Sequence, residues 1–239
     1  MEYFFTPEAF LPPGLGFAHF SAAHLAWLGF ALALGTALCL TYRRSGKRAR
    51  VRLRRGVGFA ILLCEVLKDG NLLLQGALTL DLLPLHLCGL SVFLCLYHSL
   101  RPGRTLGNFL YSTCAPGAAF ALLFPDWTAF PPWSYASIVA FTVHTLLAVY
   151  PLMQVLGGDL RPDRRELVRC GLLLLALAGP VWGFNLLFDT NYMFLRFPAP
   201  GSPLAWFAAW LGNPGYLLGY LPMIAAVWTA LYLPFRRKN

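Results

Sequence analysis

The chain has 239 residues, of which 58% are apolar and only 12% are charged, and its mean hydropathy is +0.59. Because soluble domains carry about 25% charged residues, this composition excludes a disulfide-rich secreted module, a disordered chain and a typical cytosolic enzyme. It predicts an all-α, polytopic membrane protein that forms one integral membrane domain over residues 1–239.

Seven apolar stretches reach the ~20 residues that a membrane-spanning helix needs. In chain order they lie near residues 22–42, 57–78, 82–100, 106–124, 134–156, 167–189 and 215–235. The link between the last two stretches is too long for a turn, and its apolar segment 204–211 is too short to span. We expect this segment, which carries Trp206 and Trp210, to lie in the membrane interface or to re-enter the membrane.

The net charge of +9 comes from 19 Lys and Arg against 10 Asp and Glu. With seven spans, Arg196 falls in a link on one side and Lys68 falls inside a span, which leaves 17 basic residues for the other side. Basic residues concentrate on the cytoplasmic side of a membrane. The pattern therefore predicts a multi-pass protein of the cell membrane with its N-terminus outside and its C-terminus in the cytoplasm, and it does not indicate nucleic acid as a partner.

Six cysteines lie in or beside the apolar stretches, without CxxC spacing. Cysteines in such surroundings mostly pack as small apolar side chains. The sequence therefore predicts neither a metal site nor a disulfide framework, and it indicates no cofactor.

The second predicted span contains the densest set of ionisable side chains, Glu65, Lys68 and Asp69. Their spacing of three and four residues places all three on one helical face. Each costs at least ~2.5–3.5 kcal/mol at the centre of a membrane helix. Two interpretations remain open: Glu65 and Lys68 neutralise each other as a structural pair, or the set forms the wall of a polar cavity.

The third span introduces a candidate nucleophile, Cys88, two residues after His86. On a regular helix these side chains point ~200° apart, so a base for the Cys88 thiol has to come from another helix. His144 lies near the middle of the fifth span, and a Cys–His pair is the minimal arrangement for thiolate catalysis. Alternatively, Cys88 is a packing thiol and His144 makes a hydrogen bond between helices.

Further polar residues lie near the ends of the fourth and sixth spans: Asp126, Asn185, Asp189 and Asn191. With the predicted topology these residues lie in the outer half of the membrane, as do the residues singled out above, whereas the inner half has few such groups. This one-sided distribution favours a site that opens to the outer leaflet or the outer aqueous phase. A path for ions would need polar groups across the whole membrane.

Several of these segments together resemble the YwaF-like family of bacterial integral membrane proteins. The resemblance runs through most of the chain and is carried by segments 83–88, 116–126, 141–144, 161–162, Asn185 and 190–195. That family is in turn distantly similar to a group of animal multipass membrane proteins proposed to act as cysteine-dependent acyltransferases on ether phospholipids. This relation implies a nucleophile at Cys88 and a partner at His144.

Three functions remain open. The first is a lipid acyltransferase or acyl hydrolase with membrane lipids as substrates, in which Glu65 or Asn185 orients His144 or polarises the carbonyl group. The second is a transporter or lipid-binding protein that uses the polar face of the second span. The third, a seven-span receptor, rests on the helix count alone. In the first two, the supporting residues are those of the polar outer half: Glu65, Asp69, His86, Asp126, Asn185 and Asn191.

Overall fold

The computed structural model describes residues 2–199 and 202–235, and these residues fold into helices without a β-strand. The α-helices are α1 (Ala22–Arg44), α2 (Lys47–Leu74), α3 (Leu87–Leu100), α4 (Arg104–Phe109), α5 (Ala115–Leu123), α6 (Tyr135–Gly157), α7 (Leu167–Phe188), α8 (Pro203–Gly215) and α9 (Tyr220–Tyr232). A π-helical segment, η3 (Leu110–Cys114), joins α4 and α5. Short 3-10 turns are η1 (Glu8–Phe10), η2 (Leu80–Leu82), η4 (Arg164–Glu166), η5 (Tyr192–Phe194), η6 (Tyr216–Gly219) and η7 (Leu233–Phe235).

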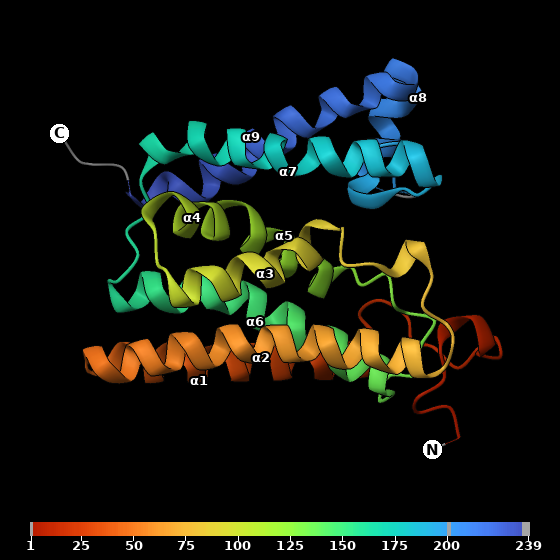
Figure 1. Cartoon of the computed structure of the whole chain (residues 1–239), viewed down its shortest axis with the longest axis horizontal. Helices are drawn as coiled ribbons and strands as arrows, with labels where there is room; N and C mark the ends of the chain where they lie inside the picture. The colour runs from red at the N-terminus through yellow and green to blue at the C-terminus, as the bar shows by residue number, and fades with distance from the viewer. Residues whose placement is uncertain (1, 200–201, 236–239) are drawn as a thin grey trace.

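Helix α6 is the centre of the fold, because it packs against α1, α2, α3 and α5. Its sequence is apolar on all sides, which is the pattern of a helix surrounded by other helices. Helix α7 contacts this bundle mainly at α4, and α9 contacts it at η3. Figure 1 accordingly shows α7 and α9 on the opposite side of α4 and α5 from α1 and α2.

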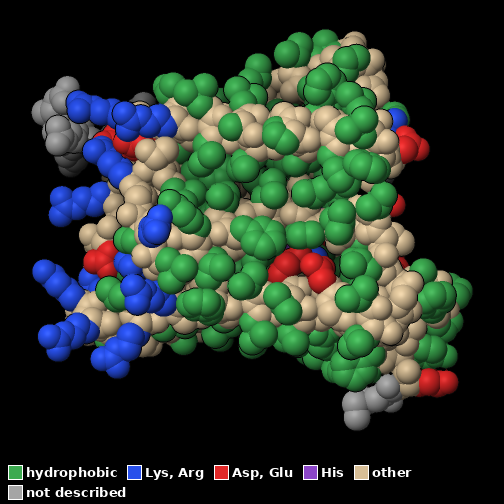
Figure 2. Space-filling view, viewed as in Figure 1, with side chains coloured by type: hydrophobic (Ala, Val, Ile, Leu, Met, Phe, Trp, Pro, Cys, Tyr) green, Lys and Arg blue, Asp and Glu red, His purple; other side chains and the backbone are tan. Residues whose placement is uncertain are grey.

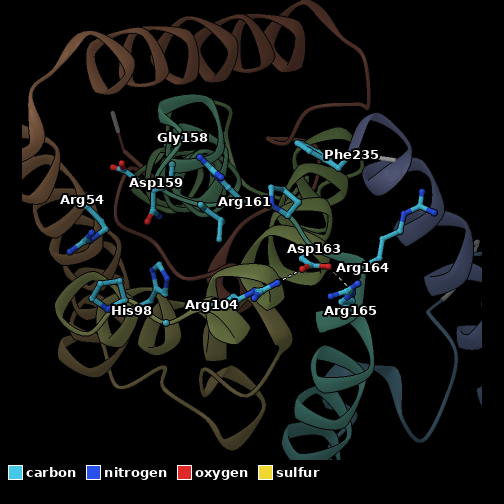
Figure 3. A pocket seen from close by; sticks show the side chains of 15 residues that line it. Arg54, His98, Arg104, Gly158, Asp159, Arg161, Asp163, Arg164, Arg165 and Phe235 are labelled. Atoms are coloured by element: carbon cyan, nitrogen blue, oxygen red, sulfur yellow. Dashed lines mark hydrogen bonds and ion pairs between the residues drawn. The ribbon is translucent and has the colours of Figure 1, made fainter. Parts of the chain in front are cut away.

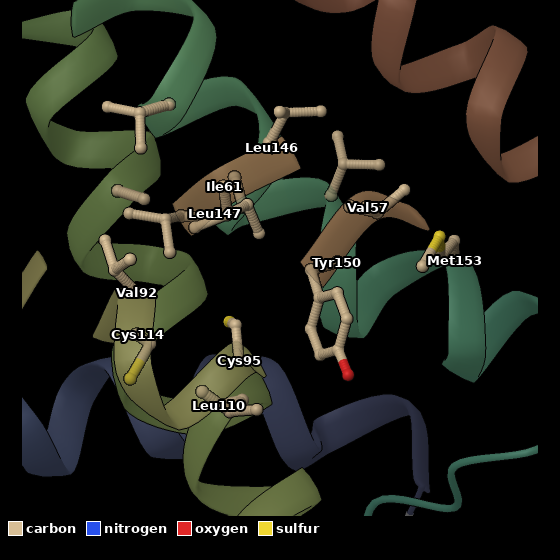
Figure 4. Packing of buried hydrophobic residues seen from close by; sticks show 14 of the residues in the cluster. Val57, Ile61, Val92, Cys95, Leu110, Cys114, Leu146, Leu147, Tyr150 and Met153 are labelled. Carbon is tan, nitrogen blue, oxygen red and sulfur yellow. The ribbon is translucent and has the colours of Figure 1, made fainter. Parts of the chain in front are cut away.

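The main apolar core lies where α2, α3, η3 and α6 meet (Figure 4). Ile61 of α2, Cys95 of α3, Leu110 of η3 and Tyr150 of α6 are all fully buried there. The outward faces of the helices are apolar too, and side chains such as Leu32 and Leu187 are more than 70% exposed. Exposed apolar surface on this scale is the signature of a protein whose outer solvent is lipid.

Five helical stretches are long and apolar enough to cross a membrane: Ala22–Arg44, Arg104–Leu123, Tyr135–Gly157, Arg164–Phe188 and Pro203–Phe235. Helix α3 is apolar but has only 14 residues. The apolar part of α2 contains Glu65, Lys68 and Asp69, which lowers its hydropathy. The molecule is thus a multi-pass membrane protein, and the side view in Figure 2 shows Lys and Arg gathered at one end of an apolar flank.

Two helices begin at other residues than the predicted apolar stretches. Helix α2 begins at Lys47 rather than near residue 57, because the Lys and Arg residues of the presumed link are good helix formers and only Ser45 and Gly46 interrupt the helix. Helix α3 begins at Leu87 rather than near residue 82. The residue before Pro84 is held in an extended conformation, so Asp81 and His86 precede the helix instead of lying on it.

The C-terminal part also differs in detail from the prediction. Segment 204–211 belongs to α8, which has non-helical backbone angles at Gly212 and Asn213. A turn, η6, then leads into α9, which is only 13 residues long. Helices α1, α6 and α7 lie within two residues of the predicted stretches.

The contact between α2 and α3 generates a prediction with an internal control. A Cβ atom at Gly58 would lie 2.7 Å from Cβ of the buried Ser99, whereas a Cβ atom at Gly56 would meet open space. Replacing a helical glycine with alanine favours the helix by about 0.5–1 kcal/mol, but overpacking costs about 1–3 kcal/mol. We expect Gly58→Ala to lower the melting temperature of the purified protein and Gly56→Ala to raise it or leave it unchanged. Equal melting temperatures for the two variants would contradict the close packing of α2 on α3.

Candidate functional site

The candidate site lies at the end of the bundle where α3 and α6 begin and α7 ends, away from the arginine-rich end (Figures 1 and 2). A cavity of about 220 Å³ opens there. It brings together three residues that the sequence analysis proposed, His86, Asp126 and Asn191. Its remaining lining residues are Asp81, Tyr192 and Phe194.

His86 is the N-cap residue of α3 and contacts the link after α7. The backbone N–H of Met193 donates to His86 Nδ1 at 3.3 Å. Since Nδ1 accepts this bond, the neutral ring carries its proton on Nε2. The rings of Tyr192 and Phe194 lie 5.0 and 5.5 Å from the imidazole, centroid to centroid, so His86 is held by this link rather than by its own helix.

Asn185 shapes that link from within. Its Nδ2 donates to the carbonyl of Tyr192 at 2.9 Å, and its Oδ1 accepts from Thr190 Oγ1 and from the N–H of Tyr192, both at 2.8 Å. The residue is fully buried. Because both amide atoms are engaged within the link, this geometry favours a positioning role for Asn185 over direct contact with a substrate.

The side chain of Asn191 acts in a similar way farther along the link. Its Oδ1 accepts from the N–H groups of Arg196 and Phe197 at 3.0 and 3.1 Å. Arg196 forms an ion pair with Asp189 at 2.5 Å and also donates to the carbonyl of Asn185 at 3.2 Å. The link is therefore a closed network of hydrogen bonds that fixes one wall of the cavity.

Cys88 is the second residue of α3, half-buried beside the apolar core. Its thiol has no hydrogen-bond partner within the part of the chain that the structure describes. The negative charges of Asp126 and Glu65 act on it and, like the apolar neighbours, disfavour an anion there. The N–H groups of a first helical turn act in the opposite direction and favour an anion.

The imidazole of His144, in α6, is held in one tautomer. Its Nδ1 lies 2.8 Å from the carbonyl oxygen of Ala140. A carbonyl only accepts hydrogen bonds, so Nδ1 carries the proton and Nε2 keeps a free lone pair. The ring stacks on Trp127 with 4.8 Å between centroids and 21° between planes, which fixes its orientation.

Asp126 connects these groups electrostatically, because its charge acts on His86, Cys88 and His144 alike. Within the described residues no hydrogen bond joins Cys88 to His144. Asp126 therefore lies within electrostatic range of all three side chains, but Cys88 and His144 are not among the residues that line the cavity.

The ionisable group of α2 lies farther along the same flank. Lys68 Nζ is 2.6 Å from Glu65 Oε1 and 3.3 Å from Asp69 Oδ1. Glu65 is buried, but the side chain of Lys68 is 37% exposed, and Asp69 Oδ1 is buried without a well-directed hydrogen bond. Figure 2 shows acidic side chains at α2 in the middle of the apolar flank. The ion pair of the first interpretation therefore forms, whereas none of these three residues lines the cavity beside His86.

Sequence reasoning missed two residues of the site. Trp127 fixes the ring of His144, and its only signal is its position next to Asp126. Tyr192 is fully buried and its hydroxyl donates to the carbonyl of Leu80. Tyr192 lies inside segment 190–195, which the sequence analysis used only for the resemblance.

Within residues 2–199 and 202–235, no group of three His, Cys, Asp or Glu side chains could hold a metal ion. All six cysteines are free thiols. The site thus offers a thiol, an imidazole base and carboxylates as its reactive groups.

Comparisons with known proteins give one match. No curated protein and no solved structure matches the chain. The resemblance to the YwaF-like family stays a prediction. The model of the TMEM164 family, however, matches residues 19–232, which is nearly the whole length. The chain therefore belongs to the TMEM164 family of multipass membrane proteins.

Proposed function

We propose that the protein is a lipid acyltransferase or acyl hydrolase in which Cys88 is the nucleophile and His144 is the base. The observation that carries the proposal is the hydrogen bond from His144 Nδ1 to Ala140, which leaves Nε2 as a proton acceptor. A neutral imidazole held in one tautomer is the usual partner of a catalytic thiol.

The reaction proceeds in two steps. His144 Nε2 takes the thiol proton, and the Cys88 sulfur attacks the carbonyl carbon of an acyl ester. The ester C–O bond breaks, the leaving alkoxide takes the proton from His144, and a thioester remains on Cys88. In the second step a hydroxyl group of another lipid, or of water, attacks the thioester and returns the proton to Cys88 through His144.

The length of α3 supports a polar site at membrane depth. Fourteen helical residues span about 21 Å, less than the ~30 Å of the hydrocarbon core. The extended residues before Leu87 have to make up the difference, and non-helical backbone survives at that depth only beside polar partners or water. Cys88 follows this extended segment directly, so water and polar head groups have access to its surroundings.

The α2 group, which consists of Glu65, Lys68 and Asp69, is partly exposed. This exposure supports access of a lipid substrate from the surrounding membrane. Lys68 is partly exposed on a flank that is otherwise apolar, and its ammonium group offers a hydrogen-bond donor to a lipid head group. In this proposal Glu65 and Asp69 hold Lys68 in place, while Asp126 and His86 line the path between head group and thiol.

We also propose that seven segments cross the membrane: α1, α2, α3, the continuous stretch from α4 to α5, α6, α7 and α9. Helix α8 stays at the membrane interface. The basic end in Figure 2 then faces the cytoplasm and the candidate site faces outward. This arrangement puts the N-terminus outside and the C-terminus inside, in the cell membrane.

A transporter or lipid-binding protein is the second candidate. It is favoured by Asp69 Oδ1, a buried carboxylate oxygen without a hydrogen bond, because such groups carry protons in coupled transport. In that case the α2 group would be essential and Cys88 would be dispensable.

Reporter fusions test the topology. Reporters placed in the Ser45–Gly46 link and after Asn239 should read cytoplasmic, and one placed after Trp133 should read external, because the basic residues stay inside. Alkaline phosphatase activity and green fluorescent protein fluorescence give opposite readings at each position. An external reading at Asn239 would remove one span.

An acyl-transfer assay tests the chemistry. The protein is reconstituted in nanodiscs with an isotope-labelled phospholipid and a lysophospholipid, and labelled products are measured by mass spectrometry. We expect Cys88→Ser and His144→Ala to reduce transfer by about 100-fold or more, and Cys95→Ser to stay near wild type because Cys95 is fully buried in the core. Gel filtration checks that each variant is folded. Transfer or hydrolysis that persists in Cys88→Ser would reject Cys88 as the nucleophile. No activity in the wild type would favour the second candidate.

A further inference from the structure

The larger cavity of the molecule lies at the arginine-rich end and is separate from the candidate site. Its volume is about 910 Å³, within the range of ligand sites. It forms where the ends of α3 and α6 and the start of α4 meet α2 and η7. The ionisable residues that line it are Arg54, His98, Arg104, Asp159, Arg161, Asp163, Arg164 and Arg165.

Both acidic residues of this cavity already have basic partners. Asp159 pairs with Arg50 at 3.2 Å and accepts a hydrogen bond from Tyr42 at 2.7 Å. Asp163 pairs with Arg104. The backbone N–H of Arg165 and the charge of Arg104 hold the pKa of Asp163 below its usual value, so this residue remains a carboxylate and Arg104 remains paired.

Four arginines of the cavity are left without a carboxylate partner in the described part of the chain: Arg54, Arg161, Arg164 and Arg165. The Arg164 guanidinium donates to the carbonyl of Tyr232. Of the Arg54 guanidinium nitrogens, only Nε donates a hydrogen bond to a described residue, to the carbonyl of Ser99 at 3.3 Å. The side chain of Arg161 makes no hydrogen bond to a described residue. Figure 3 shows Arg54 and His98 on one side of the cavity, Arg164 and Phe235 on the other, and Arg161 between them.

The floor of the cavity is polar and buried. His98 and Gln154 are 3% and 2% exposed. His98 Nδ1 lies 3.0 Å from the hydroxyl of Tyr150, and Gln154 donates to the carbonyl of Tyr150 at 2.9 Å. These contacts hold the floor in place without using the free arginines.

The preference for basic residues on the cytoplasmic side explains why arginines occur at this end. It does not explain why arginines from separate segments converge on one cavity. Guanidinium groups bind phosphate through paired N–H donors. We propose that this cavity binds a phosphorylated ligand and that Arg54 and Arg161 hold its phosphate group.

The phosphate belongs either to the head group of an anionic lipid or to a soluble compound. The experiment uses the full-length protein in phosphatidylcholine nanodiscs with two probes. Inorganic pyrophosphate is titrated by calorimetry as the soluble probe. Phosphatidylglycerol is added to the nanodiscs as the lipid probe, and lipid that stays bound is counted by native mass spectrometry.

The variants are Arg54→Gln, Arg161→Gln and, as a control, Arg55→Gln. Arg55 is the next residue on α2, equally charged but not part of the cavity. We expect Arg54→Gln and Arg161→Gln each to weaken binding about tenfold and Arg55→Gln to bind like the wild type. Arg161→Gln removes no hydrogen bond to a described residue, so it reports on binding even if Arg54→Gln folds poorly.

Each outcome decides the proposal. Arginine-dependent binding of pyrophosphate assigns a soluble phosphorylated compound, and arginine-dependent retention of phosphatidylglycerol assigns a lipid head group. No binding of either probe overturns the proposal. An equal loss in Arg55→Gln also overturns it, because binding would then reflect only the general charge of this end.

Discussion

The hydrogen bonds between the link after α7 and the residues before α3, one to a carbonyl and one to a side chain, hold the candidate site together. Pro84 keeps the backbone extended ahead of α3, and extended backbone in a membrane needs partners for its polar groups. Tyr192 supplies one at Leu80, and the N–H of Met193 pairs with His86. These bonds set where α3 begins, and therefore where Cys88 lies relative to Asp126 and His144. Asn185 holds the link in this conformation through its hydrogen bonds to Thr190 and Tyr192.

The two ends of the molecule carry different chemistry. At one end, the imidazole of His86 and the carboxylates of Asp81 and Asp126 line a small cavity. The other has a larger cavity in which arginines outnumber acidic residues. The apolar core of α2, α3, η3 and α6 separates them.

Much of the fold follows from the sequence, and less of the site does. Hydrophobic length was enough to find α1, α6 and α7, because lipid imposes the same requirement on every spanning helix. The start of α2 could not be found in this way, since arginines are polar and yet form helices well. The sequence also singled out His86, Asp126 and Asn191, which meet at one cavity. It could not foresee that both amide atoms of Asn185 form hydrogen bonds inside the link, because these depend on the conformation of an irregular segment. It also could not foresee that Trp127 orients His144, because that contact joins two separate segments.

Covalent trapping on Cys88 tests the central claim most directly. The wild-type protein is incubated with a phospholipid donor in the absence of an acceptor lipid, and its peptides are analysed by mass spectrometry before and after hydroxylamine, which cleaves thioesters. The account predicts a hydroxylamine-sensitive acyl group on the peptide that contains Cys88 and a much smaller amount when His144 is replaced by alanine. Cys39 and Cys64 are also half-buried thiols and serve as internal controls. No acyl group on Cys88, or equal acylation of Cys39, Cys64 and Cys88, would contradict the account.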